Sequence, residues 1–129
     1  MIYKNTILNI VDNCGARKAK CIKICNKFSW GKVGDIILVV LRCFYTLKKK
    51  IKKGFIYLGL IVGVKQWTYR ESGFFYRFFV NKVLICNLQF KFLGSKVFGL
   101  ISSEFQKKIY RYNGIRFYYK LLSYSCYIL

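Results

Sequence analysis

The sequence has no histidine and very few acidic residues. Only four of its 129 residues are acidic, and they lie singly along the chain, at Asp12, Asp35, Glu71 and Glu104. Histidine is the commonest general base and metal ligand, so its absence excludes Ser-His and Cys-His nucleophile pairs. No two carboxylates lie close enough in sequence to indicate a paired-acid site. The sequence therefore predicts a protein that is not an enzyme.

The six cysteines have neither the spacing of a zinc site nor the density of a disulfide scaffold. No Cys-x-x-Cys pair occurs, and Cys21 and Cys25 form a single C-x3-C, whereas structural zinc usually takes two close pairs of ligands. We expect buried, reduced cysteines that act as small hydrophobes, with no metal and no cofactor. The longest apolar runs, 54–64 and 35–41, are shorter than the roughly 20 residues that span a bilayer, so no membrane segment is predicted.

Positive charge and apolar side chains occur together in this chain. Lys and Arg number 24, for a formal net charge of +20, while 55% of the residues are apolar and 19% are aromatic. A disordered basic tail would be poor in aromatic residues. We therefore expect a folded domain with a strongly cationic surface, which repels itself unless a polyanion neutralises it.

Residues typical of β-strands dominate, and turn signals recur at short intervals. Six segments fit strands, at 6–11, 19–26, 36–45, 55–64, 74–79 and 83–90. This spacing predicts a mainly β domain, a small antiparallel barrel or sandwich, with Phe75 and Phe79 in its core. A capping box at Ser103–Gln106 predicts a short helix to about Tyr112. The chain is expected to form one domain over 1–129, with the β-fold in 1–93 and an appendage in 94–129.

Basic residues gather in four patches, which favour an RNA of irregular shape over a groove-reading helix. Five of the seven residues in 48–54 are Lys, on a predicted hairpin tip; a solvated, charged sheet edge is the alternative interpretation. Trp67 and Tyr69 lie among cations and suit stacking on unpaired bases. The predicted RNA contacts are Arg17, Lys18, Lys20, Lys48, Lys49, Lys50, Lys52, Lys53, Lys65, Trp67, Tyr69 and Arg70. The fourth patch, for RNA or protein contact, comprises Lys107, Lys108, Arg111 and Arg116.

At these residues the chain resembles the universal large-subunit ribosomal protein L-fourteen family. Residues 12–17 match the family's Asp-Asn-Ser-Gly-Ala-basic turn, with Cys14 in place of Ser. A longer pattern runs from Gly59 through Ser72-Gly73 to Leu84-Ile85 at the family's spacing. Trp67 and Tyr69 stand where the family usually has cations. The other matching segments are 21–24, 33–37, 52–54, 94–99 and 120–123.

The resemblance implies a five-stranded antiparallel β-barrel with a short C-terminal helical segment. It implies a structural protein that binds large-subunit rRNA at the intersubunit face and contributes to a bridge with small-subunit rRNA. It also implies neighbours from the ribosomal protein L-three and L-nineteen families. A ribosome-silencing factor is a further partner that the resemblance suggests.

The composition favours residues with A/T-rich codons. Lys outnumbers Arg by 18 to 6, and Ile, Phe and Tyr are abundant, while there are two Ala and no Pro. Such a bias is typical of an A/T-rich genome, so an organellar ribosome is expected. The large drift from the bacterial pattern favours the mitochondrion, with the plastid as the alternative.

Two other functions are compatible with a basic chain. A membrane-surface binder would need a long amphipathic helix, and none is evident in the sequence. A nucleic-acid enzyme would need clustered acids for metal ions, which the sequence also lacks. A general RNA-binding module outside the ribosome stays open as the alternative to a ribosomal protein.

Overall fold

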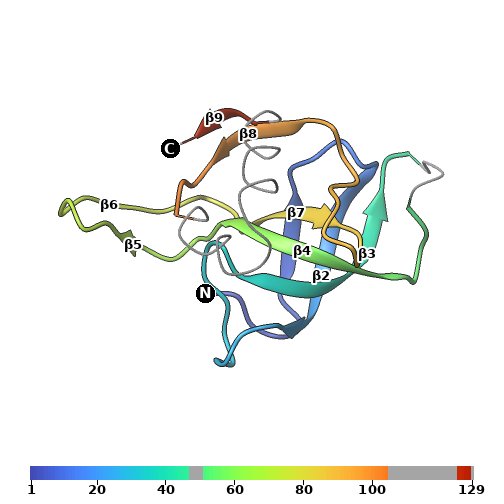
Figure 1. Ribbon diagram of the computed structural model, residues 1–129, viewed down its shortest axis with the longest axis horizontal. Coiled ribbons are helices and arrows are strands. Elements are labelled where there is room, and N and C mark those ends of the chain that lie inside the picture. The colour runs from blue at the N-terminus through green and yellow to red at the C-terminus, as the bar shows by residue number, and fades with distance from the viewer. Residues whose placement is uncertain (47–50, 105–124, 129) are drawn as a thin grey trace.

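The computed structural model describes residues 1–46, 51–104 and 125–128. Five strands close into a barrel in the order β1-β2-β3-β4-β7, and two strand pairs lie outside it (Figure 1). The barrel strands are β1 (Ile7–Ile10), β2 (Ala16–Ile24), β3 (Ile36–Phe44), β4 (Ile56–Gly63) and β7 (Lys82–Cys86). The outer pairs are β5 (Thr68–Tyr69) with β6 (Phe75–Tyr76), and β8 (Val97–Ile101) with β9 (Ser125–Ile128).

The expected five-stranded barrel is confirmed, but its strands are not all antiparallel. β1 and β7 pair in parallel through Asn9 with Lys82 and Ile10 with Val83, and β8 and β9 are also parallel. Alternation of apolar residues does not encode strand direction, so the sequence pattern could not reveal this. The expected C-terminal helix is not supported. Ser103 and Glu104 form a turn, the rest of the predicted helix lies outside the described residues, and none of the described residues is helical.

The core fills the interior of the barrel with aliphatic side chains. Leu8, Ile37, Ile61 and Ile85 are almost completely buried and belong to a single cluster. β4 is the most buried strand, since every residue after Ile56 is buried. At Gly59 a side chain is excluded, because a Cβ there would lie 2.7 Å from Cγ2 of Val83 on the neighbouring strand.

A short parallel ladder and one buried carboxylate close the barrel. The backbone N–H of Asn9 donates to the carbonyl of Asn81 at 2.9 Å, and that of Val11 to Val83 at 3.2 Å. Farther along β7, the N–H of Ile85 donates to Oδ2 of Asp12 at 3.1 Å, while Oδ1 accepts the N–H of Cys14 at 3.1 Å. Asp12 is only 4% exposed. Its side chain therefore extends the closure beyond the end of β1.

The segment 74–79 does not continue the barrel as expected. Only Phe75–Tyr76 forms a strand, and it pairs with Thr68–Tyr69 in a two-stranded arm that projects from the barrel (Figure 1). Phe75 is 58% exposed and Phe79 is 92% exposed, so their assignment to the core is wrong. The cause is geometric, because a two-stranded arm has no second layer to cover its rings.

The cysteines follow the expectation in part. Cys14, Cys21 and Cys86 are buried, whereas Cys25 and Cys43 are exposed, and these five thiols are free. The side chain of the sixth, Cys126, lies outside the described part of the chain. Burial raises the pKa of Cys14 to about 12, with Asp12 adding to the effect, and the pKa of Cys21 to about 11. These two thiols therefore stay protonated and unreactive near neutral pH.

We expect Asp12→Ala to lower the free energy of unfolding by about 3 kcal/mol, because it leaves two backbone N–H groups of the barrel seam without their carboxylate acceptor. Denaturant unfolding of the two proteins measures the difference. Asp12→Asn retains one carbonyl oxygen, so its free energy of unfolding should lie between those of the unsubstituted protein and Asp12→Ala. A loss below about 1 kcal/mol for the alanine variant would show that water or a backbone carbonyl replaces the carboxylate.

Candidate nucleic-acid interface

A β-bulge at Arg17 of β2, followed by one at Arg42 of β3, places neighbouring cations on the outside of β2. Register shifts between Ala16 and Lys18 and between Lys18 and Ala19 break the usual alternation of the strand. As a result Arg17 and Lys18 are both exposed, while Ala16 and Ala19 on either side are buried. Lys20, the third predicted contact of this strand, is half-buried. The bulges thus produce a denser cationic edge than a regular strand would.

The connection between β3 and β4 brings more lysines to the same end of the barrel. Ile51 is only 3% exposed, and a Cβ on Gly15, where β2 begins, would lie 3.1 Å from its Cδ1. The N–H of Tyr45 also donates to the carbonyl of Gly15 at 3.0 Å. Lys52 and Lys53, which follow Ile51, are exposed. Lys48, Lys49 and Lys50 lie outside the described residues.

These contacts bring two patches that are separate in the sequence together at one end of the barrel. Gly15 adjoins Arg17 and Lys18, and Ile51 adjoins Lys52 and Lys53. Gly15 has a φ of +106°, and an ideal Cβ there would approach the carbonyl oxygen of Thr46 to 2.8 Å. A residue with a side chain at this position would therefore push the two patches apart. We call the group Arg17, Lys18, Lys20, Lys52 and Lys53 the basic end.

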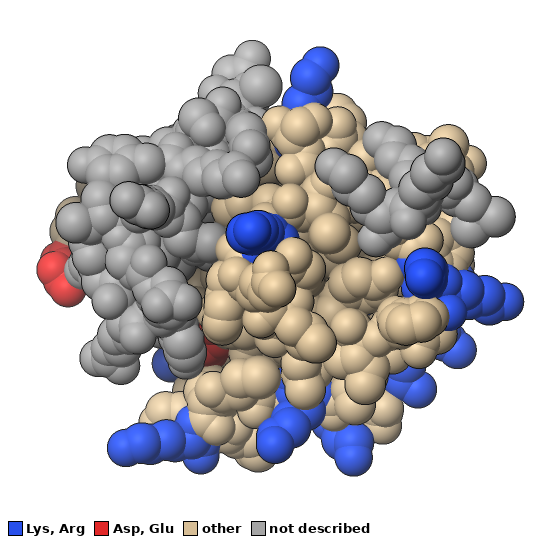
Figure 2. All heavy atoms as spheres, turned by 45° about the vertical axis from the view of Figure 1, so that its right-hand side comes forward, with Lys and Arg blue, Asp and Glu red and all other residues tan. Residues whose placement is uncertain are grey.

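The acids do little to offset this charge at the surface. Asp12 and Asp35 are 4% and 5% exposed and accept hydrogen bonds from the protein interior. Glu104 forms an ion pair with Arg70, which leaves Glu71 as the exposed acid of the four. Figure 2 shows Lys and Arg along the lower and right-hand margins of one face. The surface field of this face is therefore dominated by one sign.

The β5–β6 arm carries the aromatic residues of the third patch. Trp67 is 47% and Tyr69 is 77% exposed, as stacking residues should be. Phe75 contacts both rings, at centroid distances of 5.1 and 5.7 Å. The guanidinium of Arg77 lies 4.8 Å from the centre of the Trp67 ring. Ring and cation–π contacts take the place of a core in this arm, and Lys65 at its base is exposed.

A polar cluster ties the arm to the turn that follows β8. Nε of Arg70 lies 2.7 Å from Oε1 of Glu104, and its guanidinium lies 4.6 Å from the centre of the Tyr76 ring. The hydroxyls of Tyr76 and Ser102 donate to the other oxygen of Glu104. Burial raises the pKa of Glu104, but the hydrogen bonds from Ser102, Tyr76 and Arg70 outweigh it and hold the pKa below its usual value.

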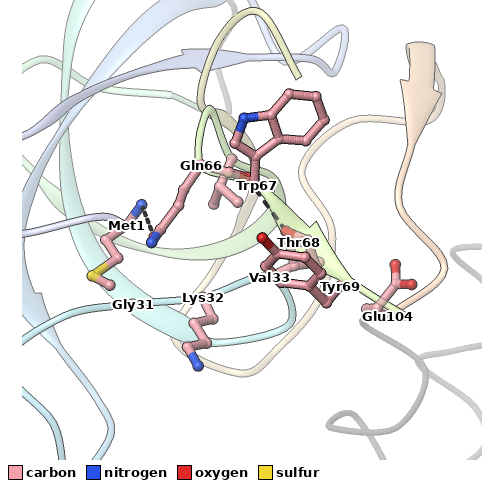
Figure 3. Close-up of a pocket in the computed structure, with 10 residues that line it drawn as sticks. Met1, Gly31, Lys32, Val33, Gln66, Trp67, Thr68, Tyr69 and Glu104 are labelled. Atoms are coloured by element: carbon pink, nitrogen blue, oxygen red, sulfur yellow. Dashed lines mark hydrogen bonds between the residues drawn. The ribbon is translucent and has the colours of Figure 1, made fainter. Parts of the chain in front are cut away.

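A pocket of about 480 Å³ opens at the base of the arm (Figure 3). Val33 and Val64 line it together with Trp67 and Tyr69, and Glu104 lies at its edge. The N-terminal ammonium of Met1 donates to Oε1 of Gln66 at 3.0 Å and so joins the chain start to the arm. The pocket has the size and the apolar lining to accept a planar ring.

One aromatic pair was missed from the sequence. Phe28 and Trp30 stack at 5.2 Å with an angle of 20° between their planes, and Nζ of Lys32 lies 4.6 Å from the centre of the Trp30 ring. Two aromatic residues at i and i+2 between Lys27 and Lys32 were the available signal. The Gly and Asp residues of 31–35 mark a loop in the sequence, and a loop pattern does not indicate that two rings stack.

The fourth patch, comprising Lys107, Lys108, Arg111 and Arg116, lies outside the described residues. Within residues 1–46, 51–104 and 125–128 there is no group of three or more His, Cys, Asp or Glu side chains that could hold a metal ion. That same part of the chain contains no helix long and apolar enough to cross a membrane.

We expect the Arg70–Glu104 ion pair to stabilise the protein in a pH-dependent way. Because the folded-state pKa of Glu104 is lowered, its contribution is present above the ordinary titration range of Glu and is lost as the pH falls through the folded pKa. Glu104→Gln should lower the free energy of unfolding by about 1 kcal/mol at pH 6. Thermal unfolding of both proteins from pH 6 to pH 3 should show the difference between their unfolding midpoints shrink as the pH falls. A difference that stays constant would contradict this expectation.

Comparison with protein families agrees with the resemblance found in the sequence. A family model described as ribosomal protein L14p/L23e matches residues 1–115. The matched range includes β1–β8, and therefore the whole barrel and the arm. A match over most of the chain, in a protein that also has a closed barrel with a cationic end, shows membership. The chain belongs to the ribosomal protein L14p/L23e family and is thus a structural protein of the large ribosomal subunit, acting within the ribosome by binding rRNA and other ribosomal proteins.

Proposed function

We propose that this protein binds large-subunit rRNA mainly through the basic end, at the intersubunit face of an organellar ribosome. The supporting observation is that Gly15 lies against Tyr45, Thr46 and Ile51, which brings Arg17 and Lys18 to the same end of the barrel as Lys52 and Lys53. A rigid barrel fixes the spacing of these cations. RNA phosphates then neutralise them and release counterions, which drives binding.

The role of each predicted contact follows from its chemistry. Lysine is a compact point charge, so Lys18, Lys20, Lys52, Lys53 and Lys65 are assigned to phosphates, which position the protein without reading sequence. Lys48, Lys49 and Lys50 are proposed to extend the same contact. The guanidinium of Arg17 lies 5.8 Å from the centre of the Tyr45 ring. It is proposed to bind a phosphate in this position.

The arm contributes shape and stacking rather than charge alone. Trp67 and Tyr69 are proposed to stack on unpaired bases, because both rings are exposed and one carries a cation, Arg77, nearby. Arg70 stays a proposed RNA contact, and its ion pair with Glu104 adds a second role, which is to hold the arm against the barrel.

The remaining partners are proposed from the family resemblance. They are small-subunit rRNA across an intersubunit bridge, neighbours of the L-three and L-nineteen families, and a ribosome-silencing factor. The fourth patch (Lys107, Lys108, Arg111 and Arg116) is proposed to contact RNA or one of these proteins. The A/T-biased composition supports an organellar ribosome, and the large drift from the bacterial pattern favours the mitochondrion over the plastid. The proposed role is structural rather than catalytic.

We expect Lys52→Ala/Lys53→Ala to flatten the salt dependence of binding to large-subunit rRNA by about two units of log K against log salt, one for each phosphate contact. Filter binding over 50–300 mM salt measures the slope. Lys91→Ala/Lys96→Ala is the matched control, since it removes two exposed lysines outside the proposed contacts. Equal slopes for the two double variants would rule out the basic end as the phosphate contact.

Fractionation tests the ribosomal assignment and its compartment together. The protein should sediment with the large subunit in an extract of purified mitochondria, and it should remain there in salt that strips loosely bound proteins. Sedimentation with plastid ribosomes would correct the compartment. Recovery on vesicles of anionic lipid, with none in the subunit fractions, would overturn the proposed function.

A further inference from the structure

A groove outside the proposed contacts lies beside the C-terminal half of β2. It has a volume of about 420 Å³ and is lined by Lys4, Ile22, Lys23, Ile24, Phe28 and Ser29. Its floor is apolar, since Ile22 and Ile24 are half-buried there, and the lysines lie at its margins with exposed side chains. A groove of this composition fits a ligand with a flat apolar part and a negative charge.

The aromatic wall of the groove is already stacked on one side. Phe28 lies nearly parallel to Trp30 at 5.2 Å, and Lys32 approaches the Trp30 ring at 4.6 Å. Even so, Phe28 is 63% exposed. A planar group that enters the groove can therefore extend an existing stack instead of having to build one.

Hydrogen bonds hold the loop that carries these rings. Oδ1 of Asn26 accepts the N–H of Phe28 at 2.9 Å, and Nδ2 of Asn26 donates to the carbonyl of Trp30 at 3.1 Å. The same Nδ2 donates to Oδ2 of Asp35 at 3.0 Å, and that oxygen also accepts the N–H of Lys32 at 2.7 Å. Because this network fixes the loop, a ligand that stacks on Phe28 loses little free energy to ordering it.

The charge around the groove favours an anionic ligand. Lys4 and Lys23 line it, and Lys27 and Lys32 flank the aromatic pair; the side chains of all four are exposed. The acid nearest in the loop, Asp35, is 5% exposed and bound to Asn26 and the backbone. An acidic peptide would satisfy the lysines but would not need the bare face of Phe28, so an unstacked base with its phosphates fits better.

We propose that this groove binds a single unstacked nucleotide of an RNA strand, with its base on Phe28 and its phosphates at Lys4 and Lys23. The proposal rests on the rRNA binding proposed above. It adds a second contact, which recognises an unstacked base in the strand rather than the total charge of the RNA. Stacking of this kind accepts any base, so the groove selects for a base that has left its helix, not for a sequence.

Tryptophan fluorescence tests the groove in the full-length protein. The chain has two tryptophans, and every variant carries Trp67→Phe, so that Trp30 is the one that remains. The probes are a short oligouridine and an abasic strand of the same length and charge. Oligouridine should quench Trp30 and bind about tenfold more tightly than the abasic strand, within the range known for stacking one base.

Substitutions at Phe28 should reproduce that difference. Phe28→Ala should weaken oligouridine binding about tenfold and leave the abasic strand unaffected, with no change in salt dependence because no charge is removed. Phe28→Tyr should restore binding. Phe79→Ala is the matched control, since it removes another exposed ring outside the groove and should change affinity less than twofold. The thermal unfolding midpoint of each variant confirms that it is folded.

The outcomes separate this proposal from the proposed function. Equal affinities for Phe28→Ala and its parent, combined with a flattened salt slope in Lys52→Ala/Lys53→Ala, would overturn the groove and leave rRNA binding standing. Unchanged RNA binding by Phe28→Ala, together with loss of this variant from the large subunit, would assign the groove to a protein neighbour. That result would overturn the proposal that the groove binds a nucleotide. Failure of the unsubstituted protein, with both tryptophans, to bind any RNA, together with no sedimentation with the subunit, would overturn the proposed function itself.

Discussion

The closure of the barrel depends on a short contact between β1 and β7. β1 and β7 share two parallel register pairs, and the carboxylate of Asp12 then takes over as the acceptor for Ile85. Two later residues pack around Asp12. An ideal Cβ on Gly94 would lie 2.9 Å from the Cβ of Asp12, and Val97 forms a backbone bridge with Asp12. One buried acid therefore joins the first turn, the last barrel strand and the start of β8.

The closed barrel also explains how a chain with so much charge can fold. Inside the barrel, aliphatic side chains such as Ile37, Ile61 and Ile85 fill the space and exclude the long cationic side chains. The cations are consequently displaced to strand faces and loops, and the register shifts on either side of Lys18 leave Arg17 and Lys18 both exposed. With Asp12 and Asp35 withdrawn into the structure, the outer surface carries nearly unopposed positive charge, which a polyanion stabilises.

The strands of the barrel were predictable because local signals bound each of them. The expected strand at 36–45 is observed at Ile36–Phe44, between a Gly-Asp turn and polar residues. β2, by contrast, begins three residues earlier than expected, at Ala16, because register shifts against β3 accommodate two consecutive cations that look like a loop in the sequence. The parallel direction of β7 depends on residues more than seventy positions apart, and no local pattern carries that information.

The candidate site was predictable in its charge and not in its geometry. Counting lysines located the basic end, but its assembly depends on Ile51 packing near Gly15, a contact between turns. Phe75 resembled a core residue, because aromatic strand residues are usually buried; the arm instead leaves it exposed. The stack of Phe28 on Trp30 depends on the side chain of Asn26, which bonds to the backbone of both residues.

The hydrogen-bonded loop around Asp35 has a consequence for ribosome assembly. Phosphate contacts alone would let this protein settle on almost any RNA, since they carry no sequence information. The groove beside Phe28 and the basic end belong to one barrel, so the two proposed contacts would form together only where an RNA offers phosphates and an extruded base at the matching separation. Under these two proposals, the protein would be retained only on RNA whose tertiary structure presents both features together.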